Sequence, residues 1–251
     1  MTLCVLDLFS GIGGFSLGLE RTGGFETVAF CEIDPFCQKV LKKHWPDVPI
    51  YNDVRTLNYD GPVDVITGGF PCQDISTAGK KAGITNETRS GLWSEIIRLS
   101  IKLRPKFIIV ENVANLLAGP SEKPGAWFGR VLGDLASIRY NAEWHCIPAS
   151  RLGAPHVRDR VWIIAYSEQG MRKGIRVSDY INDEKLENRW EANEVMPLIR
   201  CIRDDLQTDK RSLRSDDGFS EATHRIAALG NAVVPQIPEM IGYAILQAEA
   251  A

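Results

Sequence analysis

The residues best suited to chemistry surround one thiol, Cys72. An apolar, β-branched run at 63–67 precedes it and predicts a buried strand. Two glycines after that run let the backbone leave the sheet sharply, and Pro71 favours extended backbone just before the thiol. A thiol on a rigid strand exit, followed by the lysine- and arginine-containing segment 73–90, is typical of a nucleophile with a closing lid. The pattern fits equally well a buried structural cysteine beside a turn, because free cysteine is among the most buried residue types.

Two glycines near the N-terminus predict a nucleoside-binding turn. Residues 3–9 form an apolar run typical of a buried parallel strand, and Gly11 and Gly13 follow it where a helix is expected to start. The dinucleotide fingerprint GxGxxG is incomplete, since Ser16 occupies the place of its third glycine. A nicotinamide site is therefore disfavoured, and a nucleoside-binding turn of the same general kind remains.

Two acidic residues stand at the ends of the next strands. Glu32 ends a strand at 26–31, about twenty residues beyond the first strand's turn, where an acidic side chain can accept hydrogen bonds from ribose hydroxyls. The alternative is a helix N-terminal acid before Pro35 that interacts with the helix dipole. Asp53 lies in 52–54, which we expect to close a short third strand at the same edge.

Strands and helices alternate along most of the chain. Further helices are expected at 35–44, 91–102, 127–139 and 238–247, and further strands at 105–110, 143–147 and 161–165. This alternation predicts an α/β fold with a mostly parallel sheet and helices on both faces. Ligands of such sheets bind at the carboxyl ends of the strands. We expect that edge to gather Gly11, Glu32, Asp53, Cys72 and Glu111.

The domain organisation follows from a change of character beyond residue 165. The 251 residues accommodate one large domain and a small lobe. From 166 onward the chain is polar and charge-mixed, and apolar patterning returns at 225–229. We therefore assign 1–165 and 225–251 to the main domain and 166–224 to a small polar lobe.

Composition narrows the class of protein. A net charge of −3 excludes a wholly basic nucleic-acid binder but allows a local basic face. The six cysteines form no CxxC pair, which favours reduced thiols in a cytoplasmic protein over a disulfide or zinc framework. No apolar stretch reaches the ~18 residues that a membrane helix needs, and a strand-like run directly after Met1 leaves no signal peptide. We expect a cytoplasmic monomer without metal and without membrane contact.

Five motifs occur in the order and spacing of a known family. They are DLFSGIGG at 7–14, GFPCQ at 69–73, ENV at 111–113, RDRV at 158–161 and GNAVVP at 230–235. With them the chain resembles the cytosine-5 DNA methyltransferases of compact bacterial or phage type. The resemblance covers 3–165 and 225–245. It implies a Rossmann-like, S-adenosylmethionine-dependent methyltransferase fold, double-stranded DNA as partner, and a target-recognition role for 166–224.

The resemblance also implies a binding site for S-adenosylmethionine. Glu32 would take the ribose hydroxyls, Ile33 would pack on adenine, and Asp53 would accept from the adenine amino group. The full implied set is Phe9, Gly11, Gly13, Glu32, Ile33, Asp53, Leu92, Asn231 and Val233.

The implied reaction gives each catalytic residue a role. Cys72 would attack carbon 6 of cytosine, and Glu111, partly protonated through burial, would act on ring nitrogen 3. Arg160 would bind the carbonyl oxygen at carbon 2, and Arg158 would support the loop or a phosphate. A stacked cytosine is inaccessible, so the base must be flipped out of the duplex.

Three other functions remain open from the sequence. A tRNA cytosine-5 methyltransferase uses the same scaffold, and transfer of label to tRNA or to duplex DNA separates the two. A non-catalytic nucleic-acid-binding relative is disfavoured by the joint presence of Cys72, Glu111 and Arg160. A nicotinamide dehydrogenase is the least favoured alternative, because the third glycine of its fingerprint is missing.

Overall fold

The computed structural model describes residues 2–71, 89–119, 123–152, 158–167 and 231–250. Three predictions therefore fall outside the described residues: the thiol of Cys72, the lid at 73–90 apart from its last two residues, and nearly all of the polar lobe at 166–224.

Helices and strands alternate as the sequence predicts. In chain order the elements are β1 Leu3–Leu8, α1 Gly14–Arg21, β2 Phe25–Cys31, α2 Pro35–His44, β3 Ile50–Tyr51, β4 Val65–Gly68, the short helix η1 Arg89–Leu92, α3 Trp93–Leu103, β5 Phe107–Val113, α4 Asn115–Ala118, α5 Ala126–Ser137, β6 Tyr140–Pro148, the short helix η2 Ala149–Leu152, β7 Asp159–Ser167 and α9 Gln236–Ala250.

The strands form one seven-stranded sheet in the order β3-β2-β1-β4-β5-β7-β6. The pairs from β3 to β5 are all parallel, whereas β7 runs antiparallel to both β5 and β6. The predicted α/β fold with a mostly parallel sheet is confirmed. Several boundaries differ from the prediction: β3 ends at Tyr51 rather than at 52–54, β5 continues to Val113 because it pairs with β7 along its whole length, and β6, β7 and α9 extend beyond both predicted ends.

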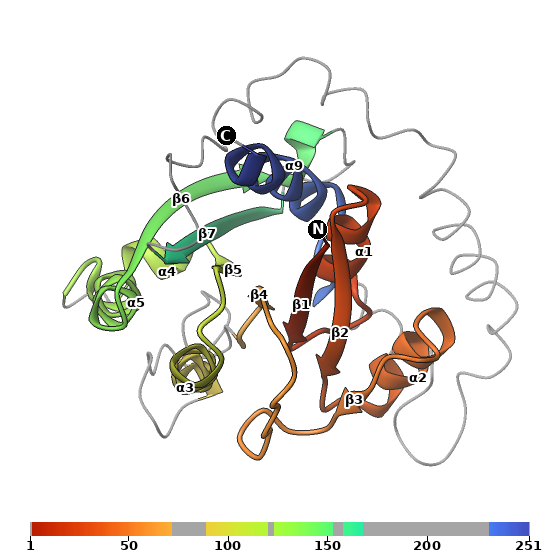
Figure 1. The fold of residues 1–251 in the computed structure, drawn as a ribbon. Coiled ribbons are helices and arrows are strands. Elements are labelled where there is room, and N and C mark those ends of the chain that lie inside the picture. Colours follow the sequence, from red (N-terminus) through yellow and green to blue (C-terminus); the bar gives the residue numbers. More distant parts are fainter. Residues whose placement is uncertain (1, 72–88, 120–122, 153–157, 168–230, 251) are drawn as a thin grey trace, which may run out of the picture.

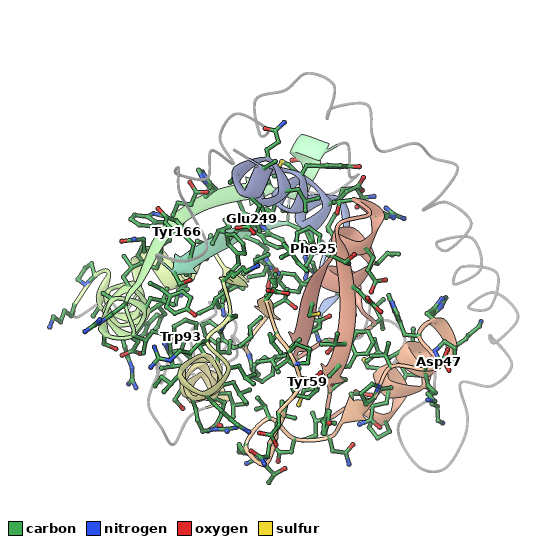
Figure 2. All side chains as sticks on the ribbon, viewed as in Figure 1. Phe25, Asp47, Tyr59, Trp93, Tyr166 and Glu249 are labelled. Atoms are coloured by element: carbon green, nitrogen blue, oxygen red, sulfur yellow. The ribbon has the colours of Figure 1, made fainter. Side chains whose placement is uncertain are left out.

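Helices cover both faces of the sheet (Figure 1). α1 and α9 pack together on one face, where Val5 of β1 points, and α3 and α5 lie on the other, where Leu6 points. Alternate side chains of a strand face opposite sides, so each strand supplies both cores. Figure 2 shows side chains filling the spaces between sheet and helices, with the buried Trp93 of α3 on the second face.

Two glycines of α1 bring the C-terminal part of the chain against the first turn of the fold. A Cβ on Gly14 would lie 2.4 Å from the carbonyl oxygen of Val233, and one on Gly18 would lie 2.1 Å from that of Pro235. Real Cβ atoms do not approach backbone oxygen so closely. The segment before α9 can therefore reach the turn after β1 only because α1 lacks side chains there.

Asp7 is a fully buried carboxyl beneath the same turn. Its oxygens accept hydrogen bonds from the hydroxyls of Ser16, at 2.9 Å, and of Thr67, its partner in the β1–β4 register, at 2.6 Å. Burial raises the pKa of Asp7 to about 7, and the two hydroxyl bonds oppose that rise.

The contact at Gly18 makes a stability prediction. Gly18→Ala forces α1 away from Pro235 and should lower the free energy of unfolding by about 1–3 kcal/mol, the usual effect of overpacking. The control is Gly133→Ala on α5, an exposed glycine with open space at its Cβ position, which should gain about 1 kcal/mol from helix propensity. Urea unfolding of both variants measures the two values, and equal gains would contradict the packing argument.

The buried carboxyl makes a pH prediction. The folded-state pKa of Asp7 lies above its unfolded value of 3.8, so its contribution to stability is fully present below pH 3.8 and is lost as pH rises through about 7. Asp7→Asn keeps an acceptor for Thr67 but cannot ionise. Between pH 5 and 6 the variant should gain stability relative to the parent by about 1.4 kcal/mol per pH unit, and the gain should level off as pH passes 7. Urea unfolding across this range checks it; a constant difference would show that Asp7 does not titrate there.

Candidate active site

The turn after β1 has left-handed backbone at three residues. Phe9, Gly11 and Gly13 have positive φ angles of 53°, 54° and 87°. Gly11 has open space around its Cβ position, whereas a Cβ on Gly13 would lie 2.6 Å from the indole of Trp45. A non-glycine residue in the left-handed region stores strain, which is concentrated at functional sites. The backbone at Gly11 is therefore open to a ligand, and Trp45 closes the turn from behind.

Glu32 is held at this turn by backbone amides. Its carboxylate accepts from the N–H of Gly11 at 2.7 Å and from the N–H of Asp34 at 2.8 Å. The cap of α2 is supplied by Asp34, whose side chain accepts from the N–H groups of Phe36 and Cys37. Glu32 thus joins the end of β2 to the glycine turn, and Asp34 fills the capping role that was the alternative for Glu32.

Ile33 and Asp53 follow Glu32 at the same edge. Ile33 is 66% exposed, so most of its apolar side chain is accessible at this edge. The N–H of Glu32 donates to the carbonyl of Tyr51, which ends β3, so Asp53 lies two residues beyond that contact. Arg55 donates three side-chain hydrogen bonds to the Asp53 carboxylate, and these bonds hold the pKa of Asp53 below its ordinary value.

The remaining predicted cofactor residues lie in two places. The carbonyl of Val233 lies against Gly14 at the first turn of α1, and Asn231 is exposed two residues before it. Leu92 is half-buried at the start of α3, packed against the core on that side of the sheet. The structure therefore joins Val233 to the glycine turn and places Leu92 on the opposite face.

Glu111 and Arg160 meet across two neighbouring strands. The Nε of Arg160 lies 3.0 Å from Oε1 of Glu111, and only 9% of Glu111 is exposed. In the antiparallel register Arg160 pairs with Val113, two residues from Glu111, so both side chains stand on one face. Burial raises the pKa of Glu111, although the charges of Arg160 and Arg158 lower it. Arg158, which has a positive φ angle of 27°, directly precedes the first residue of β7.

The backbone leading to Cys72 is fixed up to Pro71. The carbonyl of Phe70 accepts from the side-chain amide of Asn112 at 3.1 Å, and the Phe70 ring packs on Trp93 with centroids 5.5 Å apart. A Cβ on Gly69 would lie 3.6 Å from Oε2 of Glu111. The Glu111 carboxyl therefore lies beside the chain three residues before the thiol.

Comparison with known proteins gives the family. A model of the C-5 cytosine-specific DNA methylase family matches residues 3–223. The chain belongs to this family. The type II methyltransferase M2.BsuMI of Bacillus subtilis (strain 168) is 38% identical over 221 residues, which cover 78% of this chain and 56% of the relative. M.AluI of Cellulosimicrobium cellulans is also 38% identical, over 64% of this chain and 33% of that protein. The chain spans about half the length of the curated relatives that it matches.

Solved structures agree on the fold of this C-5 cytosine methylase. A DNA modification methyltransferase encoded in an E. coli prophage superposes with a TM-score of 0.57 at 28% identity, over 70% of this chain and 50% of that one. The Dnmt2 methyltransferase of S. pombe gives a TM-score of 0.63 over 98% and 99% of the two chains, and its 15% identity speaks for the fold alone. These matches confirm the Rossmann-like methyltransferase fold.

Two negative findings concern the described residues of the methylase. No helix in them is long and apolar enough to cross a membrane. In the same residues, no group of three or more His, Cys, Asp or Glu side chains could hold a metal ion.

Several supporting residues of this methylase site escaped the sequence analysis. Asn112 was visible only as part of a motif, and Arg55 only as a charge in a turn. The partners of Asn112 and Arg98 lie about forty residues away in the chain, so local spacing carries no sign of them. Gly18 also escaped it, although its signal is local, because it stands four residues after Gly14 on one helix face.

Asn112 makes the prediction for this site. Asn112→Ala leaves the buried carbonyl of Phe70 and the N–H of Val113 without their side-chain partner, and should lower the free energy of unfolding by about 1–3 kcal/mol. Asn52→Ala is the control, because the exposed Asn52 only accepts from Gln38, and it should change stability by less than about 0.5 kcal/mol. Urea unfolding distinguishes them, and matching losses would remove Asn112 as the anchor of the Cys72 segment.

Proposed function

We propose that this chain is a DNA (cytosine-5-)-methyltransferase that methylates carbon 5 of a flipped cytosine through a covalent Cys72 adduct. The observation that carries the proposal is the nearly buried Glu111 carboxyl, paired with Arg160 beside the backbone that leads to Cys72. The proposed catalytic domain comprises 1–165 and 225–251, and 166–224 is the proposed target-recognition lobe.

The residues of the carboxyl edge fit S-adenosylmethionine. Gly11 offers an unobstructed backbone, and Glu32 is fixed with a carboxylate that can accept further bonds from ribose hydroxyls. The exposed Ile33 provides an apolar surface of the kind that an adenine ring covers, and the ionised Asp53 is an acceptor for an amino group. When bound, the cofactor supplies an electrophilic methyl group on a sulfonium centre and leaves as S-adenosylhomocysteine.

The chain's own residues prepare the cytosine for that methyl group. The Cys72 thiolate forms a bond to carbon 6, and the electrons of the 5,6 double bond move toward carbon 5 and nitrogen 3. Glu111 gives its proton to nitrogen 3, which its raised pKa favours. After methylation the carbon 5 proton is lost to solvent, the bond from carbon 6 to sulfur breaks, and nitrogen 3 returns its proton to Glu111.

Arg160 and Arg158 supply positive charge and help to position the reacting groups in this scheme. Arg160 keeps Glu111 oriented at 3.0 Å and supplies a positive charge for the oxygen at carbon 2. Its own Nη1 donates to the carbonyl of Asp159 at 2.8 Å, which holds the guanidinium against β7. Arg158 lies farther along the same edge, where a cation can support the loop or a phosphate.

The proposed substrate is duplex DNA, as the type II methyltransferase relatives suggest. No observation in the described residues favours tRNA over DNA. The recognition sequence would be read by 166–224, whose arginines and lysines suit phosphates and guanine edges.

Duplex DNA with 5-fluorocytosine at the target position tests the proposal. Fluorine cannot leave carbon 5 as a cation, so the adduct between Cys72 and carbon 6 should persist after methylation. Digestion and mass spectrometry should find the base on the peptide that contains Cys72. Cys72→Ser should lose the adduct and at least about a thousandfold in methyl transfer, because a serine hydroxyl is a far weaker nucleophile than a thiolate.

The control is cofactor affinity, which Cys72→Ser should leave within about threefold, since the predicted cofactor contacts lie on other residues. Methyl transfer by the serine variant within tenfold of the parent would overturn the covalent assignment. Labelled tRNA in place of labelled DNA would move the substrate to the RNA branch.

A further inference from the structure

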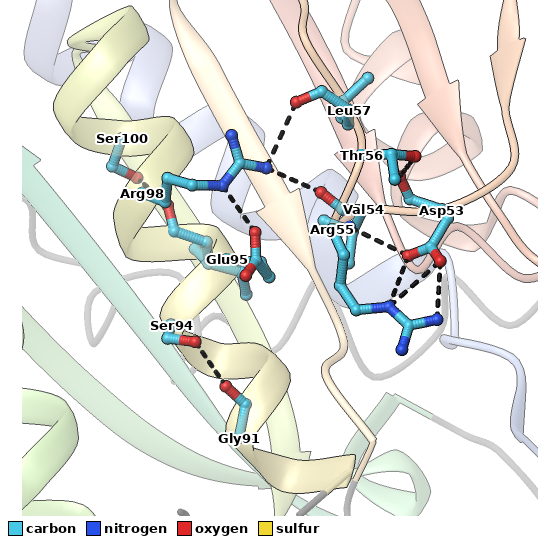
Figure 3. A network of polar contacts seen from close by, with 11 residues as sticks. Asp53, Val54, Arg55, Thr56, Leu57, Gly91, Ser94, Glu95, Arg98 and Ser100 are labelled. Carbon is cyan, nitrogen blue, oxygen red and sulfur yellow. Dashed lines mark hydrogen bonds and ion pairs between the residues drawn. The ribbon is translucent and has the colours of Figure 1, made fainter. Parts of the chain in front are cut away.

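Arg98 on α3 reaches from its helix to the segment that carries Asp53 (Figure 3). Its Nη2 donates to the carbonyl of Val54 at 2.8 Å and to that of Leu57 at 3.2 Å. Its Nε lies 2.6 Å from Oε2 of Glu95, one turn earlier on the same helix. One guanidinium therefore joins two carbonyls of the segment 53–57 to a fixed acid on α3.

The segment 53–57 is a pair of overlapping tight turns. The carbonyls of Asp53 and Val54 accept from the N–H groups of Thr56 and Leu57, so the turns close on themselves. The side chains of Val54 and Leu57 are buried in the core beneath α3. Arg98 thus binds the carbonyl groups of Val54 and Leu57, whose side chains are packed in the core. The buried side chains hold the segment against the core, and the hydrogen bonds from Arg98 fix the orientation of its backbone.

Arg55 holds the Asp53 carboxylate by direct hydrogen bonds (Figure 3). Its Nε lies 3.0 Å and 3.1 Å from the two carboxylate oxygens, and its Nη2 lies 2.7 Å from Oδ2. Hydrogen bonds from Arg55 lower the pKa of Asp53, so the group is an ionised acceptor that cannot donate. Such a group binds an amino group and repels a carbonyl oxygen at the same place.

We propose that Arg98, held by Glu95, is a positioning residue for base selection in the cofactor site: it fixes the 53–57 turns so that Asp53 meets the 6-amino group of adenine. The inference rests on the proposed function, in which Asp53 receives that amino group. It adds a residue that touches neither the cofactor nor the reacting atoms. Arg98 acts through the backbone of Val54 and Leu57, and its effect is selectivity between adenine and hypoxanthine.

A purely structural role for Arg98 predicts a different result. If the guanidinium only stabilises the fold, its loss weakens binding of every cofactor analogue by the same factor. If it aims Asp53, its loss removes only the part of the affinity that depends on the amino group. The two roles separate when one ligand carries the amino group and the other a carbonyl oxygen in its place.

Calorimetry with S-adenosylhomocysteine and S-inosylhomocysteine makes this comparison on the full chain. The parent should prefer the adenosyl compound at least about tenfold, because the inosyl compound sets a carbonyl oxygen against the Asp53 carboxylate. Arg98→Gln should reduce the preference below about threefold while changing the affinity for the inosyl compound by less than about threefold. Arg98→Lys keeps the charge with fewer donors and should fall between the parent and Arg98→Gln, which also provides a second variant should Arg98→Gln fold poorly.

The matched control is Arg130→Gln on α5. Arg130 has nearly the same exposure as Arg98, 40% against 41%, and it also forms an ion pair with an acid on its own helix, Asp134. This variant should keep the preference of the parent.

Three results would overturn the inference. An equal loss of affinity for both compounds in Arg98→Gln assigns a structural role instead. A parent that binds both compounds equally refutes the contact between Asp53 and the amino group, while leaving a cofactor site. A parent that binds neither compound overturns the proposed function and the inference with it.

Discussion

The arrangement of the site depends on one strand that runs against its neighbours. In a parallel sheet only the residues that follow strands reach the carboxyl edge. Because β7 is antiparallel to β5, its first residues arrive at that edge, and Arg160 comes to lie 3.0 Å from Glu111. A parallel β7 would carry Arg160 to the far end of the sheet and leave the Glu111 carboxyl buried without a cation, which costs several kcal/mol.

The two buried carboxyls at this edge, Asp7 and Glu111, differ in their partners and in their exposure. Asp7 is fully buried and bonded to the hydroxyls of Ser16 and Thr67, so it is enclosed and has no access to a substrate. Glu111 has an arginine partner and keeps 9% of its surface exposed, beside the backbone that leads to Cys72. Burial raises both pKa values, but of the two carboxyls only Glu111 keeps any exposed surface. A raised pKa therefore indicates catalysis only where the group can be reached.

The sequence predicts the fold and most of the edge, because both depend on local patterns. Apolar runs and glycine turns place Gly11, Glu32 and Asp53 at strand ends; the structure confirms this for Gly11 and Glu32, whereas Asp53 lies two residues beyond the end of β3. Strand direction is not a local property, so the antiparallel β7 and the diagonal contact between Glu111 and Arg160 follow only from the assembled sheet. The contacts of Asn112 and Arg98 likewise join residues about forty positions apart in the chain. A polar side chain on a strand or helix does not indicate which distant residue it will bind, so these contacts could not be predicted.

α3 links the two halves of the site, although none of its own residues was predicted to be catalytic. Its first residue, Trp93, supports Phe70 at the start of the Cys72 segment, and its indole N–H donates to Asp134 of α5 at 2.9 Å. Less than two turns later, Arg98 holds the segment that carries Asp53. A helix is stiff over this length, so a displacement at one end moves the other. One stiff helix therefore contacts both Phe70, in the backbone that leads to Cys72, and the segment that carries Asp53.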